Sequence, residues 1–481
     1  MKQFLIAAVL LSTISSCIHS PDIIDKTYSP GKLKKDLLVL KDLLENVHAG
    51  VFVYINEKGF NSLFDSMTAS ITSALTQREF YDKVDFIIEN IHCAHSDCYF
   101  PQDYFDTLLN RKYFFPIPLV KIGEKIYINT KNYNIPNGSE VFSINNNTIK
   151  EIFSKLLYHK HTDGFSKSYK DDAINVDFAY DYYIAYGISD SFSIKFRDAV
   201  TNEVVYMTVR PQTLNEVYRI ADDDTYYSFP GDFYYDFKIE DDQKTALLTI
   251  RTFSQESYSQ ADAFENFLQN SFSLLQLKGI KNLVIDYRNN KGGYFRSSYE
   301  LLRYFIAGPL RQFDSVLKRF NHLPFKDYVS AGDSSLKEHI DTSYKQYKAI
   351  AAHRYALQAP EIDTCFPAAH LFKGKLYIIT NGDVISAAAS SVALLKEKAG
   401  ATIVGEETGG GYASFNSQVV TYLLPNSGIR VDIPTLRYYP PVTKKGNSNG
   451  VRPDYYRPLT RPDFTDFNDG PLQFILDTLI H

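Results

Sequence analysis

Residues 376–398 read LYIITNGDVISAAASSVALLKEK, and this stretch decides how the rest of the chain is interpreted. An apolar run ends at Thr380, Asn381-Gly382 marks a turn, and Ser386 begins a segment of small residues. Gly400, directly after that segment, is a typical helix-ending residue. The pattern predicts a strand, a tight turn and a helix, which is the repeating unit of a mainly parallel α/β sheet.

The same rhythm recurs on both sides of this stretch. Upstream, LVIDYRNNKGG at 283–293 is an apolar run that ends at Asp286 and leads through a polar turn to Gly292-Gly293. Consecutive glycines let a backbone approach a ligand closely and direct an N–H at it. Active sites of parallel sheets lie at the carboxyl ends of strands, so both turns are candidates. The other expected elements are strands at 246–250 and 401–404 and a helix over 264–275.

A serine at the start of a helix usually only caps that helix. The same position also exposes a hydroxyl beside free helix N–H groups, which can hold a developing oxyanion. The small residues after Ser386 leave room for a substrate to come close. Considered alone, the stretch favours a helix cap over a nucleophile, and the rest of the chain has to decide.

Four motifs in a fixed order resemble the tail-specific (C-terminal processing) protease family. The family order is D-x-R-x-N-x-G-G, Ser-Ala at a helix start, G-E-x-T-x-G and G-V-x-P-D. In this chain these motifs lie at 286–293, 386–387, 405–410 and 450–454. The resemblance implies a crotonase-like (ClpP-like) α/β core, with Ser386 as nucleophile and the N–H groups of Gly293 and Ala387 as the oxyanion hole.

A serine hydroxyl is a poor nucleophile and needs a base. Many family members place a Lys just after G-E-x-T-x-G, where this chain has Gly411. The tricorn-like branch instead uses a His from the N-terminal part, and the segment NIHCAHS matches that place. We expect His95 to be the base, since free imidazole titrates at about pH 6.5, and His92 is the alternative. The orienting Glu of that branch is replaced near Asn447, whose amide could orient an imidazole by hydrogen bonding.

The segment HCAHSDC at 92–98 also carries four potential metal ligands. Structural zinc sites normally take two ligand pairs from separated segments, so we expect no metal here. Cys93 and Cys98 could form a disulfide and leave Cys365 over, or all three could stay reduced. His159 and His161 lie in a polar stretch and are expected to be solvated.

The N-terminus has the pattern of a signal peptide. Lys2 is followed by an apolar run at 4–11, which is shorter than the roughly 20 residues that span a bilayer. Ile14-Ser15-Ser16-Cys17 resembles the bacterial lipobox, so 1–17 is predicted to be a lipoprotein signal peptide with the lipid on Cys17. This predicts an exported protein, anchored in the periplasm or at the cell surface. The alternative is a plain signal peptide with an incidental cysteine.

The chain has 481 residues, enough for two to four domains of roughly 100–200 residues each. The formal net charge of −5 gives no basic surface for nucleic acid. Leucines from Leu33 to Leu44 recur at helical spacing. The predicted layout is a helical domain at 18–118, a β-rich module resembling PDZ-like domains at 119–211, and a core at 237–481. An insertion at 308–372 shows no clear strand and could form a helical lid.

These features predict an α/β serine peptidase that acts without a cofactor. It would hydrolyse exported polypeptides through an acyl-enzyme, as an endopeptidase or as a carboxyl-terminal processing peptidase. The missing Lys and Glu favour an alternative, a non-catalytic lipoprotein of the same fold that binds a peptide or an apolar ligand, as the retinoid-binding relatives of the family do. A purely structural surface lipoprotein is a third reading. The oligomeric state stays open.

Overall fold

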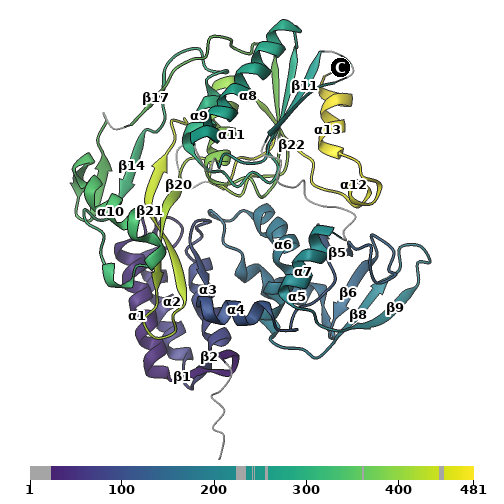
Figure 1. The fold of residues 1–481 in the computed structure, drawn as a ribbon, viewed down its shortest axis with the longest axis vertical. Coiled ribbons are helices and arrows are strands. Elements are labelled where there is room, and N and C mark those ends of the chain that lie inside the picture. The colour runs from purple at the N-terminus through teal and green to yellow at the C-terminus, as the bar shows by residue number, and fades with distance from the viewer. Residues whose placement is uncertain are drawn as a thin grey trace, which may run out of the picture.

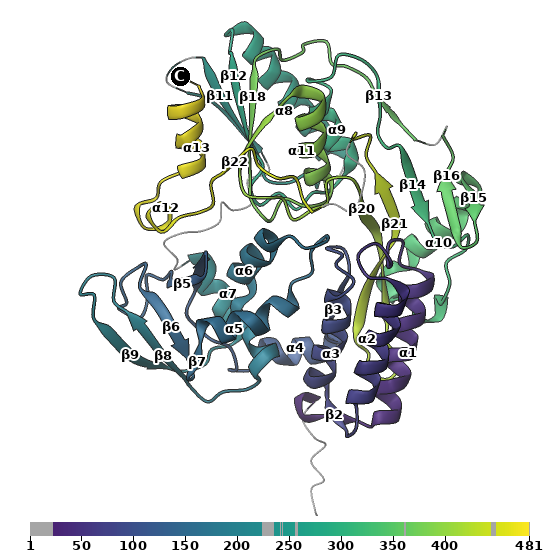
Figure 2. The same ribbon diagram turned by 180° about the vertical axis from the view of Figure 1, so that it is seen from behind.

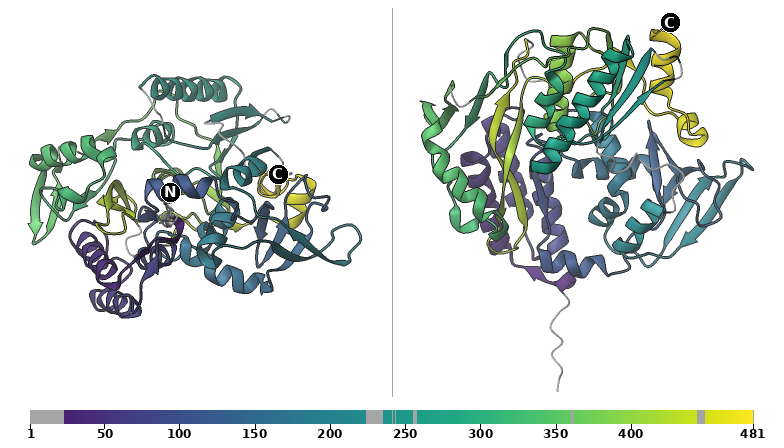
Figure 3. Two further views of the ribbon diagram at one scale, coloured as in Figure 1. Left: turned by 60° about the horizontal axis from the view of Figure 1, so that its bottom comes forward. Right: turned by 45° about the horizontal axis from the view of Figure 1, so that its top comes forward.

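The computed structural model of the protein describes residues 23–223, 235–240, 242, 244–254, 258–359, 362–443 and 449–480. Cys17 and Asn447, which the sequence singled out, lie outside the described residues. Figures 1 and 2 show three parts: N-terminal helices and a β-rich module lie side by side, and an α/β layer lies across both. The two tilted views of Figure 3 show the same three parts.

The N-terminal part is a group of helices around one apolar core. The leucines that were expected to share one helix face are buried, namely Leu33, Leu37, Leu40 and Leu44. The second helix begins at an Asn56 cap and the third at a Thr76–Glu79 capping box, so side chains satisfy their first free N–H groups. The elements are α1 (Pro30–Asn46), α2 (Glu57–Ser70), α3 (Gln77–Glu89), α4 (Gln102–Leu109), β1 (Thr27–Tyr28), β2 (Leu75–Thr76) and β3 (Asp97–Tyr99).

The β-rich module contains one antiparallel sheet in the order β4-β5-β6-β8-β9, with β7 beside β6. It also contains a long helix, α6, that the sequence analysis missed. The buried residues Ile174, Phe178 and Tyr182 of α6 recur every four positions, but aromatic and acidic residues between them hide that pattern. The elements are β4 (Leu119–Ile122), β5 (Lys125–Ile128), β6 (Glu140–Ile144), β7 (Asn147–Thr148), α5 (Ile149–Leu156), α6 (Lys167–Tyr186), β8 (Phe192–Arg197), β9 (Val204–Val209) and α7 (Leu214–Asp223).

The α/β layer holds the predicted parallel sheet, in the order β10-β11-β12-β18-β19-β22. All neighbours pair in parallel except the edge strand β10, which is antiparallel to β11. No helix among the described residues combines the length and apolar character needed to cross a membrane. The elements are β10 (Tyr235–Ile239), β11 (Thr245–Ile250), α8 (Tyr258–Leu277), β12 (Asn282–Asp286), α9 (Phe295–Leu302), β18 (Lys375–Thr380), α11 (Ser386–Ala399), β19 (Thr402–Gly405), β22 (Tyr455–Tyr456), α12 (Arg461–Asp466) and α13 (Gly470–Phe474).

A long hairpin, β20 (Phe415–Leu423) and β21 (Arg430–Tyr439), joins the α/β layer to the N-terminal helices. It runs from beside α11 down to α1 and α2 in Figure 1. Its far end packs in the same buried cluster as the α1 leucines. Asp36 of α1 accepts hydrogen bonds from the N–H groups of Asn426 and Ser427 at the hairpin turn. The hairpin therefore ties residues at the two ends of the chain into one unit.

The insertion at 308–372 differs from the expected helical lid. Three of its strands extend the hairpin sheet in the order β15-β16-β14-β21-β20. Phe320, Leu323 and Ile340 pack into the N-terminal core. The strands escaped detection because they are short and several of their residues are exposed, so no alternating pattern develops. The elements are β13 (Leu310–Arg311), β14 (Ser315–Lys318), α10 (Ser334–Thr342), β15 (Tyr347–Ala351), β16 (Arg354–Leu357) and β17 (Thr364–Cys365).

The side chains of His159 and His161 are buried, so the expectation that they are solvated is wrong. His159 Nδ1 bonds one oxygen of Asp85. His161 Nε2 lies 2.9 Å from the other oxygen, in a charge contact that lacks hydrogen-bond alignment. His161 Nδ1 lies 3.3 Å from Asp97. The two histidines lie in a polar stretch because they pair with Asp85 of α3 and Asp97 of β3, and not because they face water.

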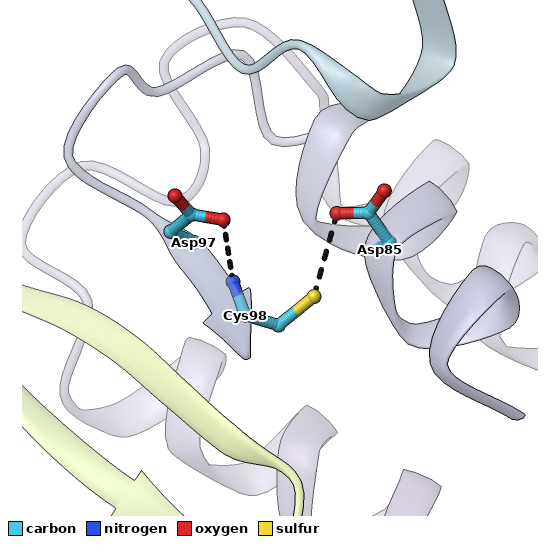
Figure 4. A group of neighbouring side chains, drawn as sticks. All are labelled: Asp85, Asp97 and Cys98. Atoms are coloured by element: carbon cyan, nitrogen blue, oxygen red, sulfur yellow. Dashed lines mark hydrogen bonds between the residues drawn. The ribbon is translucent and has the colours of Figure 1, made fainter. Parts of the chain in front are cut away.

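Cys98 belongs to the same cluster, between the two carboxylates (Figure 4). Its Sγ donates to Asp85 Oδ1 at 3.4 Å and its N–H donates to Asp97 Oδ1 at 2.7 Å. Cys93, Cys98 and Cys365 are all buried free thiols, so the disulfide alternative does not hold in the structure. The carboxylate oxygens of Asp85 already contact both histidines and the thiol.

The charges of this cluster stabilise each other. Burial alone would raise the pKa of Asp85, but the adjacent His161 and His159 outweigh burial and hold it below its usual range. Burial likewise opposes the charge on His161, yet Asp85 and Asp97 raise its pKa to about 10. The cluster is therefore an ion network at neutral pH.

We expect His161→Ala to lower the free energy of unfolding by roughly 3–5 kcal/mol near pH 6, since it strips a buried carboxylate of a partner. The pKa of His161 is about 10 in the folded protein and about 6.5 when unfolded. Its contribution is therefore complete below about pH 6.5 and disappears as the pH rises through about 10. Urea unfolding at both ends of this range, with the exposed His339→Ala as control, checks the effect. A difference that stays constant with pH would contradict it.

Candidate active site

Ser386 lies where the central strand β18 gives way to α11, as the sequence predicted. Its φ of +55° is in the left-handed region, which non-glycine residues rarely adopt. Such strain persists only where the surrounding structure imposes it, and it concentrates at functional sites. The side chain is 8% exposed. Ser386 is therefore almost fully buried at the N-terminus of α11.

His95 is the side chain that meets Ser386. His95 Nε2 lies 3.1 Å from Ser386 Oγ, although the two residues are 291 positions apart in the sequence. His95 is half-buried and comes from the loop between α3 and β3. The structure thus brings together the two residues that the sequence analysis named as nucleophile and base.

Strand pairing holds the His95 loop against the α/β layer. Directly after the loop, β3 pairs antiparallel with β21, with Asp97 opposite Asp432 and Cys98 opposite Val431. Asn416 of β20 donates from Nδ2 to Cys93 Sγ at 3.2 Å. These partners belong to the hairpin β20–β21, which follows α11 in the chain. The hairpin therefore holds the His95 loop next to the part of the α/β layer that carries Ser386.

His48 supports the loop from the other side, and the sequence analysis missed it. Its Nδ1 accepts from the Gly50 N–H at 3.0 Å, so Nε2 carries the proton and donates to Ser96 Oγ at 2.9 Å. Burial, followed by the nearby Arg437, lowers the pKa of His48 to about 3, which keeps the ring neutral. Ser96 adjoins His95, so His48 helps to hold the loop that carries His95 in place. A lone histidine just after a helix gives no pattern that would reveal this role.

Gly292 and Gly293 lie beside Ser386 with φ of +92° and +133°. A Cβ on Gly292 would lie 2.7 Å from Ser386 Cβ and 3.0 Å from the Ala387 nitrogen. A Cβ on Gly293 would lie 2.2 Å from the Ser254 nitrogen. Glycine is therefore required at both positions for conformation and for space.

Two backbone N–H groups are candidates for the oxyanion site. Within the described residues, neither the Ala387 N–H nor the Gly293 N–H donates to a protein acceptor. The Ala387 N–H belongs to the first turn of α11, where helix N–H groups lack partners within the helix. The neighbours of Gly293 are paired, since Phe253 N–H donates to Gly292 O and Tyr294 N–H donates to Phe253 O. The turn is thus fixed while the two donors remain available.

The polar residues of the other motifs connect these elements. Asn290 is fully buried and accepts from the Gly292 N–H at 2.9 Å, while its own carbonyl accepts from the Ile385 N–H at 3.2 Å. Thr408 Oγ1 accepts from the Val451 N–H at 2.7 Å. Asp454 Oδ2 accepts from the Ile403 N–H at 2.9 Å. The polar side chains of these motifs therefore hold the backbone segments around Ser386 together.

Asp286, which ends the strand before the glycine turn, faces arginines and not Ser386. Its carboxylate lies 2.7 Å from Arg251 Nη2 and 2.7 Å from Arg288 Nη2. Burial would raise the pKa of Asp286, but the two arginines outweigh burial and hold it below its usual range. Asp286 thus braces the carboxyl end of β12 as a permanent anion.

The protonation state of His95 suits a base. Burial lowers the pKa of His95 below 6.5, and the negative charge of Asp163 opposes that effect. The lowered pKa leaves the ring neutral at pH 7, with one nitrogen able to accept a proton from Ser386. Among the described residues nothing pairs with the enclosed Nδ1 of His95.

The competing histidine takes a different place. His92 has a φ of +55° and its ring packs 4.5 Å from the Phe165 ring and 6.4 Å from the Tyr54 ring, centroid to centroid. Its Nδ1 lies 3.9 Å from Glu89. Of the four potential metal ligands at 92–98, His95 contacts Ser386, Cys93 contacts Asn416 and Cys98 contacts Asp85. These side chains thus point to separate partners.

Comparison with known proteins agrees with this fold. Residues 244–457 match the sequence model of Peptidase family S41. The crystal structure of mature CPAF is similar with a TM-score of 0.63 and 14% identity, over 94% of this chain and 96% of that chain. Mature CPAF complexed with lactacystin gives a TM-score of 0.64 and 15% identity, over 93% and 97%. No curated protein matches the sequence.

At this level of identity the structural likeness shows a shared mixed α/β fold along nearly the whole chain. The matched family segment contains all four sequence motifs and Ser386. The protein is a serine-type peptidase. Its residues 244–457 match Peptidase family S41, the tail-specific proteases that its motifs resemble.

Proposed function

We propose that this protein cleaves exported polypeptides through an acyl-enzyme on Ser386, as an endopeptidase or as a carboxyl-terminal processing peptidase. The observation that carries the proposal is the 3.1 Å contact between His95 Nε2 and Ser386 Oγ. It joins a hydroxyl at a strained helix start to a neutral imidazole, which is the arrangement that activates a serine nucleophile. The match of residues 244–457 to Peptidase family S41 supports a polypeptide as the substrate.

In the first half of the reaction, Ser386 Oγ attacks the scissile carbonyl carbon while its proton passes to His95 Nε2. The carbonyl oxygen gains negative charge, which the N–H groups of Ala387 and Gly293 would hold. His95 then gives the proton to the leaving amine as the C–N bond breaks. A water molecule then attacks the acyl carbon while His95 takes its proton. His95 returns that proton to Ser386 Oγ as the bond between the acyl carbon and Oγ breaks, which completes hydrolysis without a cofactor.

Finer features of the fold support the same proposal. We infer that the α/β layer is a crotonase-like core and that residues 119–211 act as a PDZ-like module. PDZ-like domains take a peptide end by adding it as a strand to a sheet edge. The sheet order leaves β9 as an edge strand with alternately exposed residues. A substrate peptide that docks on β9 would therefore be bound by the same chain that carries Ser386.

A fluorophosphonate probe tests the proposal, because it reacts only with an activated serine. Wild-type protein should be labelled on Ser386, and the label should be found on the peptide that contains residues 386–398. Lactacystin, the compound in one CPAF complex, should compete with the label. Absence of labelling, together with no cleavage of a broad peptide set, would favour the alternative of a non-catalytic peptide- or apolar-ligand-binding lipoprotein.

The lipobox resemblance leads to a separate proposal about location. We propose that the mature protein begins at Cys17 and is held to a bacterial membrane, in the periplasm or at the cell surface, by lipid on that residue. Cys17→Ser removes the thiol that would carry the lipid and should shift the protein from the membrane fraction to the soluble fraction. Fractionation followed by immunoblotting measures the shift. A variant that still sediments with membranes would contradict lipidation.

A further inference from the structure

One buried carboxylate near the Ser386–His95 pair belongs to none of the four motifs. Asp163 is 2% exposed and lies in the connection before α6. Its Oδ1 accepts from the N–H of Ala94, the residue that precedes His95, at 3.0 Å. Its Oδ2 accepts from the Gly411 N–H at 3.4 Å. One side chain therefore contacts the backbone of the base loop and the position where other members of the family have their lysine.

The connection that carries Asp163 is held firmly on both sides. The Gly164 N–H donates to the His92 carbonyl at 3.0 Å. Thr162 Oγ1 donates to the Gly409 carbonyl at 3.4 Å, and Ser166 Oγ donates to the Thr408 carbonyl at 3.3 Å. These contacts fix the carboxylate between the His95 loop and the segment after β19. In the part of the chain that the structure describes, Asp163 forms no ion pair that would neutralise its charge.

The other titratable groups around His95 carry no negative charge at neutral pH. Burial raises the pKa of the Cys93 thiol to about 11, and burial also raises the pKa of Tyr54 above its usual value. Burial keeps the pKa of His48 at about 3, so that ring is neutral. Arg437 is the cation of the group, and its guanidinium donates to Asn416 Oδ1 at 3.1 Å. Among the described residues, Asp163 is the carboxylate whose negative charge acts on the His95 ring.

His95 has no hydrogen-bonded carboxylate among the described residues to stabilise a positive charge on its ring. Its Nε2 contacts Ser386, while its enclosed Nδ1 has no partner among the described residues. The family branch with a Ser–His pair orients this imidazole with a Glu, which this sequence lacks. An imidazolium that forms inside a protein requires a nearby negative charge, because burial disfavours the charged ring.

We propose that Asp163 is the charge partner of His95 and stabilises the imidazolium that forms when Ser386 gives up its proton. The inference rests on the proposed function and deepens it. The proton moves from Ser386 Oγ to His95 Nε2 and then to the leaving amine, while Asp163 stays unprotonated throughout. Asp163 acts through the field at His95 and through the backbone of Ala94, so it is a positioning residue.

Asp163→Asn is the first test, because it keeps the size of the side chain and removes its charge. We expect the plateau of kcat/KM to fall about 10- to 100-fold. The carboxylate favours the charged ring, so its loss lowers the pKa of His95. The acidic limb of the kcat/KM profile should therefore move to lower pH by about one unit. A purely structural role would lower the plateau and leave the limb where it is.

Three further variants keep the test decisive. Asp190→Asn removes an exposed carboxylate and should leave plateau and limb unchanged. Asp163→Glu retains the charge and should keep the limb near that of wild type. Asp163→Ser is a second uncharged variant, smaller than Asn, for the case that Asn disturbs folding. An unfolded fraction reduces the amplitude of the profile but does not move its limb, so the shift remains readable.

A direct titration separates this inference from the proposed function. The His95 ring can be followed by NMR in histidine-labelled protein and assigned with His95→Gln, whether or not the protein cleaves peptides. A pKa lower by about one unit in Asp163→Asn supports the inference. An unchanged His95 pKa overturns it. If wild type is labelled on Ser386 while Asp163→Asn leaves both pKa and limb unchanged, only the role of Asp163 is wrong.

Discussion

Ser386→Ala should abolish peptide hydrolysis, with a loss of at least about 10³-fold and up to about 10⁶-fold in kcat. The variant keeps the N–H groups of Ala387 and Gly293 but has no oxygen to form the acyl-enzyme. The free energy of unfolding should change by less than about 1 kcal/mol, which is at the low end of the cost of removing a serine from a helix start. Among the described residues the Ser386 hydroxyl forms a hydrogen bond with His95 alone, so no helix cap is lost.

Peptide cleavage and thermal unfolding, measured on the same preparations, check this expectation. Ser390→Ala is a matched control, since it removes a second buried hydroxyl from α11 four residues further on. That control should be labelled by a fluorophosphonate and should cleave peptides like wild type. Cleavage by Ser386→Ala at a rate comparable to wild type would show that another group is the nucleophile.

His95→Ala should reduce kcat/KM by about 10³- to 10⁴-fold, since it removes the hydrogen-bond partner of Ser386 Oγ seen among the described residues. His92→Ala should cost much less, because His92 packs against Phe165 and Tyr54 and does not touch Ser386. The two variants differ by three positions and serve as each other's control. The reverse ranking would make His92 the base.

The pH dependence of the wild-type enzyme follows from the same residue. The base must be neutral, so kcat/KM rises with pH as His95 loses its proton. Burial is the largest influence on His95 and lowers its pKa, so the midpoint of the rise should lie below the 6.5 of a free imidazole. A profile that rises only in the alkaline range would identify a lysine base instead and would overturn the assignment of His95.

The absence of a lysine base has a structural counterpart at Gly411. A Cβ at this position would lie 2.5 Å from the Ser414 carbonyl oxygen. The Gly411 N–H faces Asp163, and Gly411 forms a bridge with Gly450. A lysine therefore does not fit the backbone as it lies here. The backbone at Gly411 therefore agrees with the proposal that His95, and not a lysine at this position, serves as the base for Ser386.

The local elements of the α/β layer could be predicted from the sequence. The strand before Asn381, the helix from Ser386 and its end at Gly400 are all present. Their patterns arise within a few residues, because periodic burial and turn chemistry depend on the backbone geometry of each segment. The helix α6 and the strands of the insertion lack such clean patterns, and they were missed for that reason.

The spacing of the motifs also located Ser386 and the glycine turn, since both lie at carboxyl ends of neighbouring parallel strands. Which base serves Ser386 was left open between His95 and His92, because three residues of loop can turn either ring inward. Pairing of β3 with β21 places His95, and not His92, beside Ser386, and that pairing depends on a hairpin more than 300 residues away. Sequence periodicity carries no information about such a contact.

The histidines outside the active site show the same division. The sequence analysis missed His48, and it predicted wrongly from their polar surroundings that His159 and His161 are solvated. Tertiary structure decided their charges: His48 is neutral because it is buried with hydrogen bonds to Gly50 and Ser96, while His161 is charged because Asp85 and Asp97 face it. A titratable side chain takes its charge from neighbours in space, and folding brings those neighbours from distant parts of the chain.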